Sequence, residues 1–163
     1  MAKIIVSNTG PIISLEKLDE GFEFIRKLYD QIIVPEAVLE ELAGDRFSFA
    51  AEYLYVHEID NLLDIRPVFE ISDIPEIHRL DRGEKQAISL AYQLGLPLLI
   101  EETMGRQIAS SAGIQISGIA GQIIKAFKEN LILRDEAARM LKAMFDSGRI
   151  NRKIYKSLLA GLK

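Results

Sequence analysis

The sequence contains no cysteine. It can therefore form neither a disulfide framework nor a zinc site with thiolate ligands. The only two histidines, His57 and His78, are isolated from each other, and we interpret both as surface or helix-flanking residues. No apolar run approaches the roughly 18 residues of a membrane span. The apolar run after Met1 is too short for a signal peptide, so we expect no membrane association and a cytoplasmic location.

Several common catalytic motifs are also absent. There is no Gly-x-x-x-x-Gly-Lys loop and no Gly-x-Gly-x-x-Gly loop, so nucleotide binding through either motif has no support. Serines are present, but none lies in a Gly-x-Ser-x-Gly elbow.

What the sequence does contain is typical of a globular protein. Of its 163 residues, 48% are hydrophobic and 27% are charged. This length is usual for one domain with a sizeable core. There is no internal repeat, low-complexity tract or linker, so we expect residues 1–163 to form a single domain.

Charge is distributed unevenly along the chain. The net charge is −4, but residues 125–163 carry ten Lys/Arg and four Asp/Glu, a net charge of +6. Residues 1–124 carry the opposite excess, with ten Lys/Arg and twenty Asp/Glu. Two interpretations stay open: a basic region that contacts nucleic acid or an acidic partner, and a pair of solvated amphipathic helices.

Short apolar runs alternate with helical periodicities along most of the chain. The pattern predicts strands at residues 3–7, 31–34, 97–100 and 114–117. It predicts helices at residues 11–18, 22–29, from 35 onward, 84–94, 106–112, 119–128, 135–145 and 151–162, the last of them capped by Asn151. Residues 45–80 have no clear pattern beyond a possible helix at 47–55. The alternation predicts an α/β fold of three layers, αβα, around a mainly parallel sheet of four to five strands.

Four polar motifs lie where a predicted strand ends or a predicted helix begins. They are Ser7-Asn8-Thr9, Glu40-Glu41, Gly83-Glu84 and Glu101-Glu102. In an open parallel sheet, ligands bind outside the carboxyl ends of the strands. Carboxylates gathered there would repel one another unless a hard cation lay between them, and oxygen ligands suit Mg²⁺ or Mn²⁺. The motifs therefore predict a metal-dependent phosphoryl-transfer site.

Each motif also has a local structural interpretation. The sequence around Asn8 is typical of a turn and helix cap. Glu40 and Glu41 fit a solvated helix face, although Glu41 lies closer to the buried face and is the better candidate. Glu84 is favourable at a helix N-terminus by ~0.3–1 kcal/mol. The pair Glu101-Glu102 is harder to explain by solvation, because it follows an apolar strand at the usual ligand crevice.

The order and spacing of these segments resemble the PIN-domain family, the nuclease fold of many prokaryotic toxins, and in particular a branch of uncharacterised PIN-like proteins. The resemblance covers nearly the whole chain. It rests on residues 5–13, 33–42, 80–88 and 98–102, on Gly105 and Arg106, and on glycines 113, 118 and 121.

The resemblance implies an endoribonuclease that uses Mg²⁺ or Mn²⁺ and cuts RNA, with single-stranded RNA as the expected substrate. The implied catalytic and metal-binding positions are Asn8, Glu41, Glu84 and Glu102, with Glu101 as a further metal ligand. Arg106 and the C-terminal Lys/Arg residues would hold the phosphate backbone. The resemblance also implies a toxin role with an antitoxin protein as partner, and assembly as a homodimer.

Two of these positions differ from the usual family pattern. The first is usually Asp, and Asn8 removes a formal charge from the metal site. The fourth motif is usually Asp-Asp, and each glutamate adds a methylene. A second hypothesis is therefore a catalytically impaired PIN-like module that binds RNA or a partner protein. A third is a phosphate-metabolising α/β enzyme of another fold, which requires basic residues near Glu101.

Overall fold

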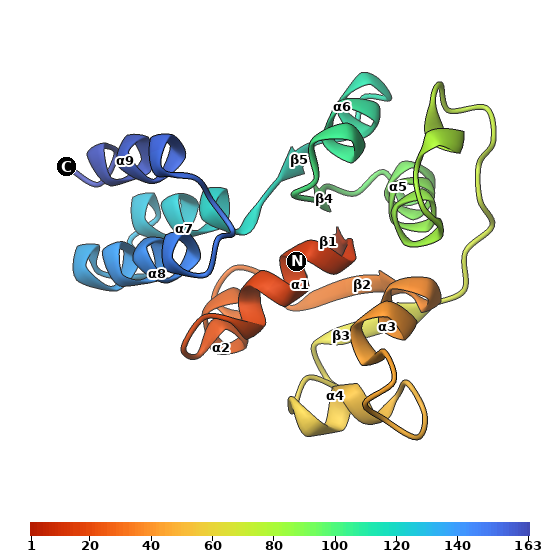
Figure 1. The fold of residues 1–163 in the computed structure, drawn as a ribbon, viewed down its shortest axis with the longest axis horizontal. Helices are drawn as coiled ribbons and strands as arrows, with labels where there is room; N and C mark the ends of the chain where they lie inside the picture. The colour runs from red at the N-terminus through yellow and green to blue at the C-terminus, as the bar shows by residue number, and fades with distance from the viewer.

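A computed structural model describes residues 1–163, and a five-stranded sheet forms its centre (Figure 1). The strands are β1 (Ile4–Ser7), β2 (Gln31–Pro35), β3 (Leu63–Arg66), β4 (Leu98–Leu99) and β5 (Ile116–Ser117). Their order in the sheet is β3-β2-β1-β4-β5, and every neighbouring pair is parallel. The predicted α/β fold class is confirmed.

Helices cover the two faces of the sheet and form two separate apolar cores. The larger core contains buried residues of α1, α2, α3, α7 and α8, and the smaller one contains those of α5 and α6. Strand β1 contributes to both, because Ile5 belongs to the larger core and the adjacent Val6 to the smaller one. This alternation is what a strand buried on both faces produces.

The helices differ widely in length. They are α1 (Thr9–Glu16), α2 (Gly21–Arg26), α3 (Glu36–Ala43), α4 (Glu52–Val56), α5 (Arg82–Leu94), α6 (Thr103–Ser111), α7 (Ile119–Lys128), α8 (Arg134–Asp146) and α9 (Arg152–Ala160), with a 3₁₀ turn at Ile77–Arg79. No helix combines the length and the hydrophobicity that crossing a bilayer requires.

Polar side chains cap the N-termini of α5, α6 and α9. The Asp81 side chain accepts a hydrogen bond of 2.9 Å from the Glu84 backbone N–H and so caps α5. Glu102 caps α6 in the same way through the backbone N–H groups of Met104 and Gly105. Asn151 caps α9, as the sequence predicts, by accepting from the Ile154 N–H at 2.8 Å. Each cap satisfies backbone donors that would otherwise lack partners.

The sequence-based boundaries need correction in the middle of the chain. Strand β3 lies within the segment that has no clear sequence pattern. The helix expected at residues 47–55 forms only at Glu52–Val56, as α4. Helix α5 begins at Arg82, before the glycine expected to precede it. The helix predicted at 119–128 coincides with α7.

Candidate metal-binding site

A cavity of about 380 Å³ lies at the carboxyl edge of the sheet, and none of its lining residues is hydrophobic. Its lining comprises Asn8, Thr9, Gly10, Glu41, Asp81, Glu84, Glu101, Glu102, Gly148 and Arg149. All five residues predicted as metal ligands are in this set. We call this space the acidic cavity, because five carboxylates and a single cation line it.

The sheet topology explains why these residues meet. Strands β1 and β4 are parallel neighbours with Ser7 opposite Leu99, so the residues that follow them emerge side by side. The backbone N–H of Asn8 donates to the Leu99 carbonyl at 3.0 Å and extends this pairing past the strand end. Glu41 comes from α3, which packs against α5, and Glu84 comes from the first turn of α5.

Asn8 is buried, with only 6% of its surface exposed, and its side-chain oxygen Oδ1 has no hydrogen-bond partner. Although Asn8 occupies the N-cap position of α1, its side chain makes no capping hydrogen bond. The local interpretation as a side-chain cap therefore does not account for this residue. Leaving a buried polar atom unpaired costs about 1–3 kcal/mol, which indicates that Oδ1 is placed to contact a ligand.

Glu84 and Glu102 form a carboxylate pair. Partial burial, then a hydrogen bond with Glu102, then repulsion by Asp81 and Glu102 raise the pKa of Glu84 to about 8. The pKa of Glu102 is lowered, mainly because the backbone N–H of Gly105 donates to it at 2.8 Å. The pair therefore holds one proton near neutral pH, and that proton lies on Glu84.

Glycine 105 makes the close approach of this pair possible. A Cβ at this position would lie 2.8 Å from Oε2 of Glu84 and 3.4 Å from Oε2 of Glu102. Oε2 of Glu84 is buried and, like Oδ1 of Asn8, has no partner among the N–H and hydroxyl donors of the protein. A second unpaired oxygen in the same cavity strengthens the case for a ligand there.

Glu41 is held at the cavity by α1 and α5. Thr9 Oγ1 donates a hydrogen bond of 2.7 Å to Glu41 Oε2. The Glu41 carboxylate also packs against Gly83, where a Cβ would overlap Oε1. The neighbouring Glu40 points elsewhere and pairs with Arg82 at 3.1 Å on the surface. These contacts agree with the choice of Glu41 over Glu40 as the candidate ligand.

Glu101 is already engaged by protein groups. Its Oε1 accepts from Ser14 Oγ at 2.7 Å and from Arg149 Nη2 at 3.2 Å, and its Oε2 accepts from the Ile119 N–H at 3.1 Å. Arg149 also donates through Nε to Ser14 and through Nη2 to the Gly10 carbonyl, each at 2.9 Å. Glu101 therefore anchors Arg149 in this structure, and its role as a metal ligand stays a prediction.

Two charged residues of the cavity were not predicted as site residues. Asp81 was detectable, because an acid three residues before Glu84 at a helix start is a capping signal. Arg149 has no local signal, since it reaches the cavity from the connection between α8 and α9. Arg106, which was predicted to hold phosphate, does not line the cavity and donates to the Ile100 carbonyl at 2.8 Å.

The donor set fits a hard divalent cation such as Mg²⁺ or Mn²⁺. The available ligands are all oxygens, two of them are buried without partners, and two carboxylates are close enough to share a proton. No group of three or more His, Asp or Glu side chains is placed to hold an ion directly. Mg²⁺ commonly binds through one or two carboxylates and keeps several waters, so this arrangement suits it.

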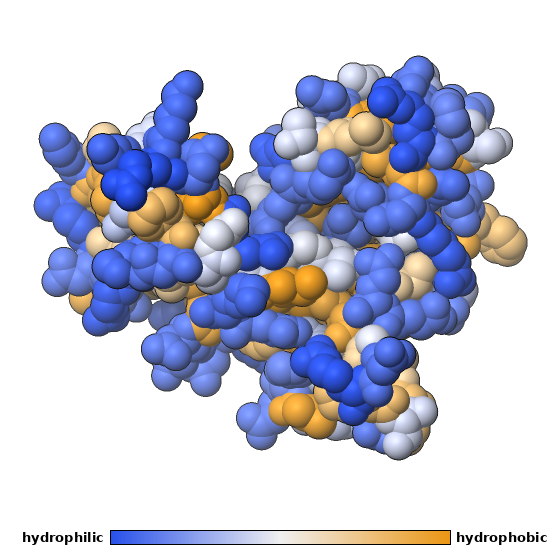
Figure 2. All heavy atoms as spheres, viewed as in Figure 1, coloured by the Kyte–Doolittle hydropathy of each residue, from blue (hydrophilic) through white to orange (hydrophobic).

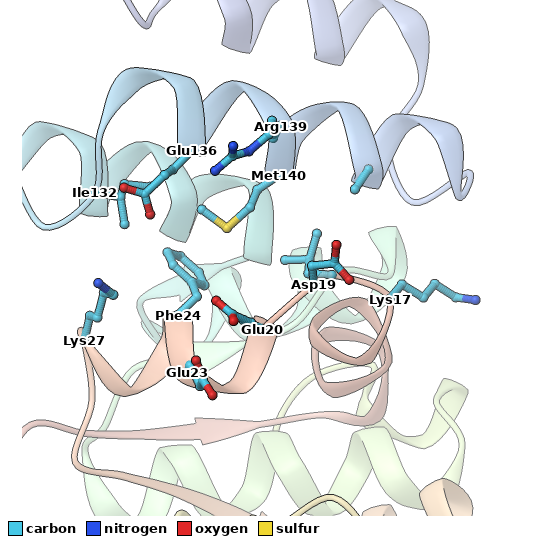
Figure 3. Close-up of a pocket in the computed structure, with 12 residues that line it drawn as sticks. Lys17, Asp19, Glu20, Glu23, Phe24, Lys27, Ile132, Glu136, Arg139 and Met140 are labelled. Atoms are coloured by element: carbon cyan, nitrogen blue, oxygen red, sulfur yellow. The ribbon is translucent and has the colours of Figure 1, made fainter.

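A second cavity, of about 540 Å³, lies between α2 and α8 (Figure 3). Phe24 and Met140 point toward each other across it, with Lys17, Lys27 and several acids around them. It contains none of the predicted site residues. Its lining mixes charges of both signs with apolar side chains, so no single type of ligand group converges there.

The family of the chain is identified by a match that extends over almost the whole sequence. A family model described as "DUF3368: PIN domain" matches residues 4–163. The chain belongs to the PIN-domain family. This confirms the resemblance seen in the sequence and assigns a nuclease-type fold. PIN domains generally use divalent metals, in agreement with the oxygen-only donor set of the acidic cavity.

Similarity to individual proteins is more distant. Among solved structures, a PilT N-terminus domain protein from the hyperthermophilic archaeon Sulfolobus solfataricus P2 is 14% identical, with a TM-score of 0.47. The match covers 71% of this PIN-domain chain and 87% of the archaeal one. No curated protein matches the sequence.

Proposed function

We propose that this PIN-domain protein is a metal-dependent endoribonuclease that cleaves single-stranded RNA in the acidic cavity. The observation that carries the proposal is the pair of buried, unpartnered oxygens, Asn8 Oδ1 and Glu84 Oε2, in a cavity lined by five carboxylates. A buried oxygen without a hydrogen-bond donor is costly, and it is favourable when it ligates a cation.

Asn8, Glu41, Glu84 and Glu102 would hold Mg²⁺ or Mn²⁺, directly or through water, with Glu101 beside them. When bound, the ion supplies an acidified water and neutralises charge on the scissile phosphate. Thr9 orients Glu41 through its 2.7 Å hydrogen bond, and the N–H of Gly105 orients Glu102. Glu84 must lose its proton to act as a ligand, so metal binding should release a proton.

We also propose that the protein acts as the toxin of a toxin–antitoxin pair, with an antitoxin protein as its partner. The support for this proposal is membership of the PIN-domain family, whose fold is that of the nucleases among many prokaryotic toxins. Expression in a bacterial host should arrest growth, and Glu84→Gln should relieve the arrest. Growth arrest that persists in the Glu84→Gln strain would argue against toxicity through this site.

A second candidate function is a PIN-like module that binds RNA or a partner protein without efficient cleavage. The amide at position 8 favours it, because an amide gives the cation less charge than a carboxylate would. The absence of three directly converging acids points the same way.

Cleavage of a labelled single-stranded RNA with Mn²⁺ separates the two functions. We expect weak cleavage by the wild type. Cleavage should increase about tenfold in Asn8→Asp, because added ligand charge tightens divalent binding. Glu84→Gln should not cleave the RNA. Asn8→Asp should also melt at a lower temperature in EDTA, since it buries a charge. Strong wild-type cleavage that Asn8→Asp leaves unchanged would show that the amide is no handicap. No cleavage by either protein would favour the binding module.

A further inference from the structure

The C-terminal segment, residues 147–163, is strongly basic. Residues 147–163 contain five Lys/Arg and no Asp/Glu. The segment starts in the cavity wall itself, because Gly148 and Arg149 are lining residues. Three further cations, Arg152, Lys153 and Lys156, follow on α9, and all three are exposed. We call these three residues the α9 patch.

The position of the α9 patch at the helix N-terminus is electrostatically unfavourable for α9. Arg152 and Lys153 are the first two residues of α9, and its first turn contains no acid. A helix N-terminus carries partial positive charge, so a cation there is unfavourable for the same reason that an anion is favourable. The helix dipole and the cations add to one positive field, which an external anion would relieve.

The α9 patch has no acidic partner in the protein. None of its three cations takes part in any ion pair of the structure. Arg152 instead lies over the ring of Phe145, 5.5 Å from its centroid. Phe145 is stacked on Tyr155 with 4.8 Å between centroids. This packing holds the start of α9 in place while its charges remain available to solvent.

Arg149 anchors the segment that leads into α9 at the acidic cavity. Its guanidinium donates to Glu101, Ser14 and Gly10, three partners at the carboxyl edge of the sheet. The connection between α8 and α9 therefore reaches the middle of the molecule, next to α1 (Figure 1). In the same view, the surface is indented between the lobe of α7–α9 and the part that carries α6 (Figure 2).

We propose that the α9 patch binds the phosphates of single-stranded RNA that flank the phosphate in the acidic cavity. This rests on the proposed function. A cavity lined by five carboxylates repels a polyanion, so cations beside it are needed to retain the strand. The patch supplies them next to the cavity wall, on a segment that has no negative charge. Phosphate contacts of this kind position the strand without reading its sequence.

The test measures the salt dependence of RNA binding. Fluorescence anisotropy of a labelled single-stranded RNA would be recorded with Ca²⁺ in place of Mn²⁺, and a denaturing gel would check that the RNA stays intact. The variant Arg152→Gln/Lys153→Gln/Lys156→Gln removes the patch. Its matched control, Lys17→Gln/Lys27→Gln/Lys128→Gln, removes the same charge from exposed residues that do not line the acidic cavity. Thermal melts would check the fold of both.

We expect the slope of log K against log salt to fall by about 2 in the patch variant, since each single-strand phosphate contact contributes about 0.7. The control variant should keep the wild-type slope. An unchanged slope in the patch variant, an equal fall in the control, or no detectable RNA binding would overturn the proposal. Equally patch-dependent binding of poly-glutamate would also overturn it, by showing a surface for acidic proteins.

The salt dependence of RNA binding and the Mn²⁺-dependent cleavage test the two proposals independently. Patch-dependent RNA binding without Mn²⁺-dependent cleavage would support the α9 patch while rejecting the nuclease activity. Cleavage that persists in a patch variant with an unchanged salt slope would leave the nuclease proposal standing and reject the patch.

Discussion

Glu84 and Glu102 show how neighbouring atoms set the properties of one residue. The two carboxyls lie in the same cavity, yet the pKa of Glu84 is raised and that of Glu102 is lowered. The difference arises because Glu102 receives the Gly105 N–H, while Glu84 loses solvent and faces two acids. A bound cation would replace the proton that now keeps the pair together.

This difference predicts a pH-dependent stability. The pKa of Glu84 is about 8 in the folded protein, against an ordinary value of 4.5. The folded state therefore binds more protons than the unfolded state between these pH values, and the stability falls as pH rises through them. In EDTA, Glu84→Gln should gain melting temperature relative to the wild type from pH 5 to pH 8.5. Mn²⁺ should stabilise the wild type at pH 8 and leave the variant little changed.

The control for this experiment is Glu36→Gln, an exposed glutamate outside the cavity. Its melting temperature should track the wild type over the whole range. Glu102 does not interfere above pH 5, because its lowered pKa confines its titration to more acidic solution. A constant difference between Glu84→Gln and the wild type across the pH range would contradict the prediction.

At the scale of elements, the packing of α3 against α5 positions Glu41, and Gly83 allows that approach. In Gly83→Ala the new Cβ would displace the Glu41 carboxylate, the flexible end of an exposed side chain, and break its hydrogen bond with Thr9. Stability should hold or rise, since Ala is favoured over Gly inside a helix by roughly 0.5–1 kcal/mol. Mn²⁺ affinity, measured by calorimetry, should fall about tenfold, as expected for the loss of one charged ligand.

Lys85→Ala, in the same turn of α5, is the matched control and should leave Mn²⁺ affinity unchanged. A Gly83→Ala protein that unfolds at a much lower temperature would show that the backbone, rather than Glu41, has to move. Full Mn²⁺ affinity in a stable Gly83→Ala protein would remove Glu41 from the proposed ligand set.

The sequence predicts a helix well where apolar residues recur at helical spacing or where a capping residue marks the first turn. Helix α7 and the Asn151 cap of α9 are such cases. Strand β3 was missed because it is an edge strand with only Leu63 buried, so Asp64 and Arg66 interrupt the apolar pattern. Its charges pair with each other at 2.9 Å, a contact that sequence periodicity does not reveal.

The candidate site was predictable only in part. Residues at strand ends and helix starts were found because the parallel topology brings such positions to one edge. The contact of Arg149 with Ser14 spans 135 positions, and no local pattern encodes it. The unpaired oxygen of Asn8 was equally hidden, since the sequence around it reads as an ordinary cap.

At the scale of the whole molecule, the apolar residues of the C-terminal helices divide into two groups. Leu141 and Met144 are buried in the larger core, so they pack on the protein itself. Ile154 is 44% exposed, and with Leu158 it lines a surface hollow of about 410 Å³. Tyr155, Leu158 and Leu159 pack partly against the larger core, so Ile154 is the apolar residue of α9 that stays exposed.

We predict that the protein is a homodimer in which Ile154 lies at the interface. Light scattering at micromolar concentration should give about twice the chain mass of 18.3 kDa. Ile154→Asp should lower the mass to that of one chain without unfolding the protein, because Ile154 lies at the surface. A wild-type mass of 18.3 kDa that does not change on dilution would rule the dimer out.

The hydrogen bonds of Arg149 also determine when the acidic cavity forms as the chain is synthesised and folds. Its contacts with Gly10 and Ser14 join residues 139 and 135 positions apart, so they close very long loops. Contacts of such separation are costly in chain entropy and form late in folding. On the ribosome, strand β1 is complete long before residue 149 exists. The lining of the acidic cavity is therefore complete only after residue 149 has been synthesised, and a shorter nascent chain carries an incomplete site.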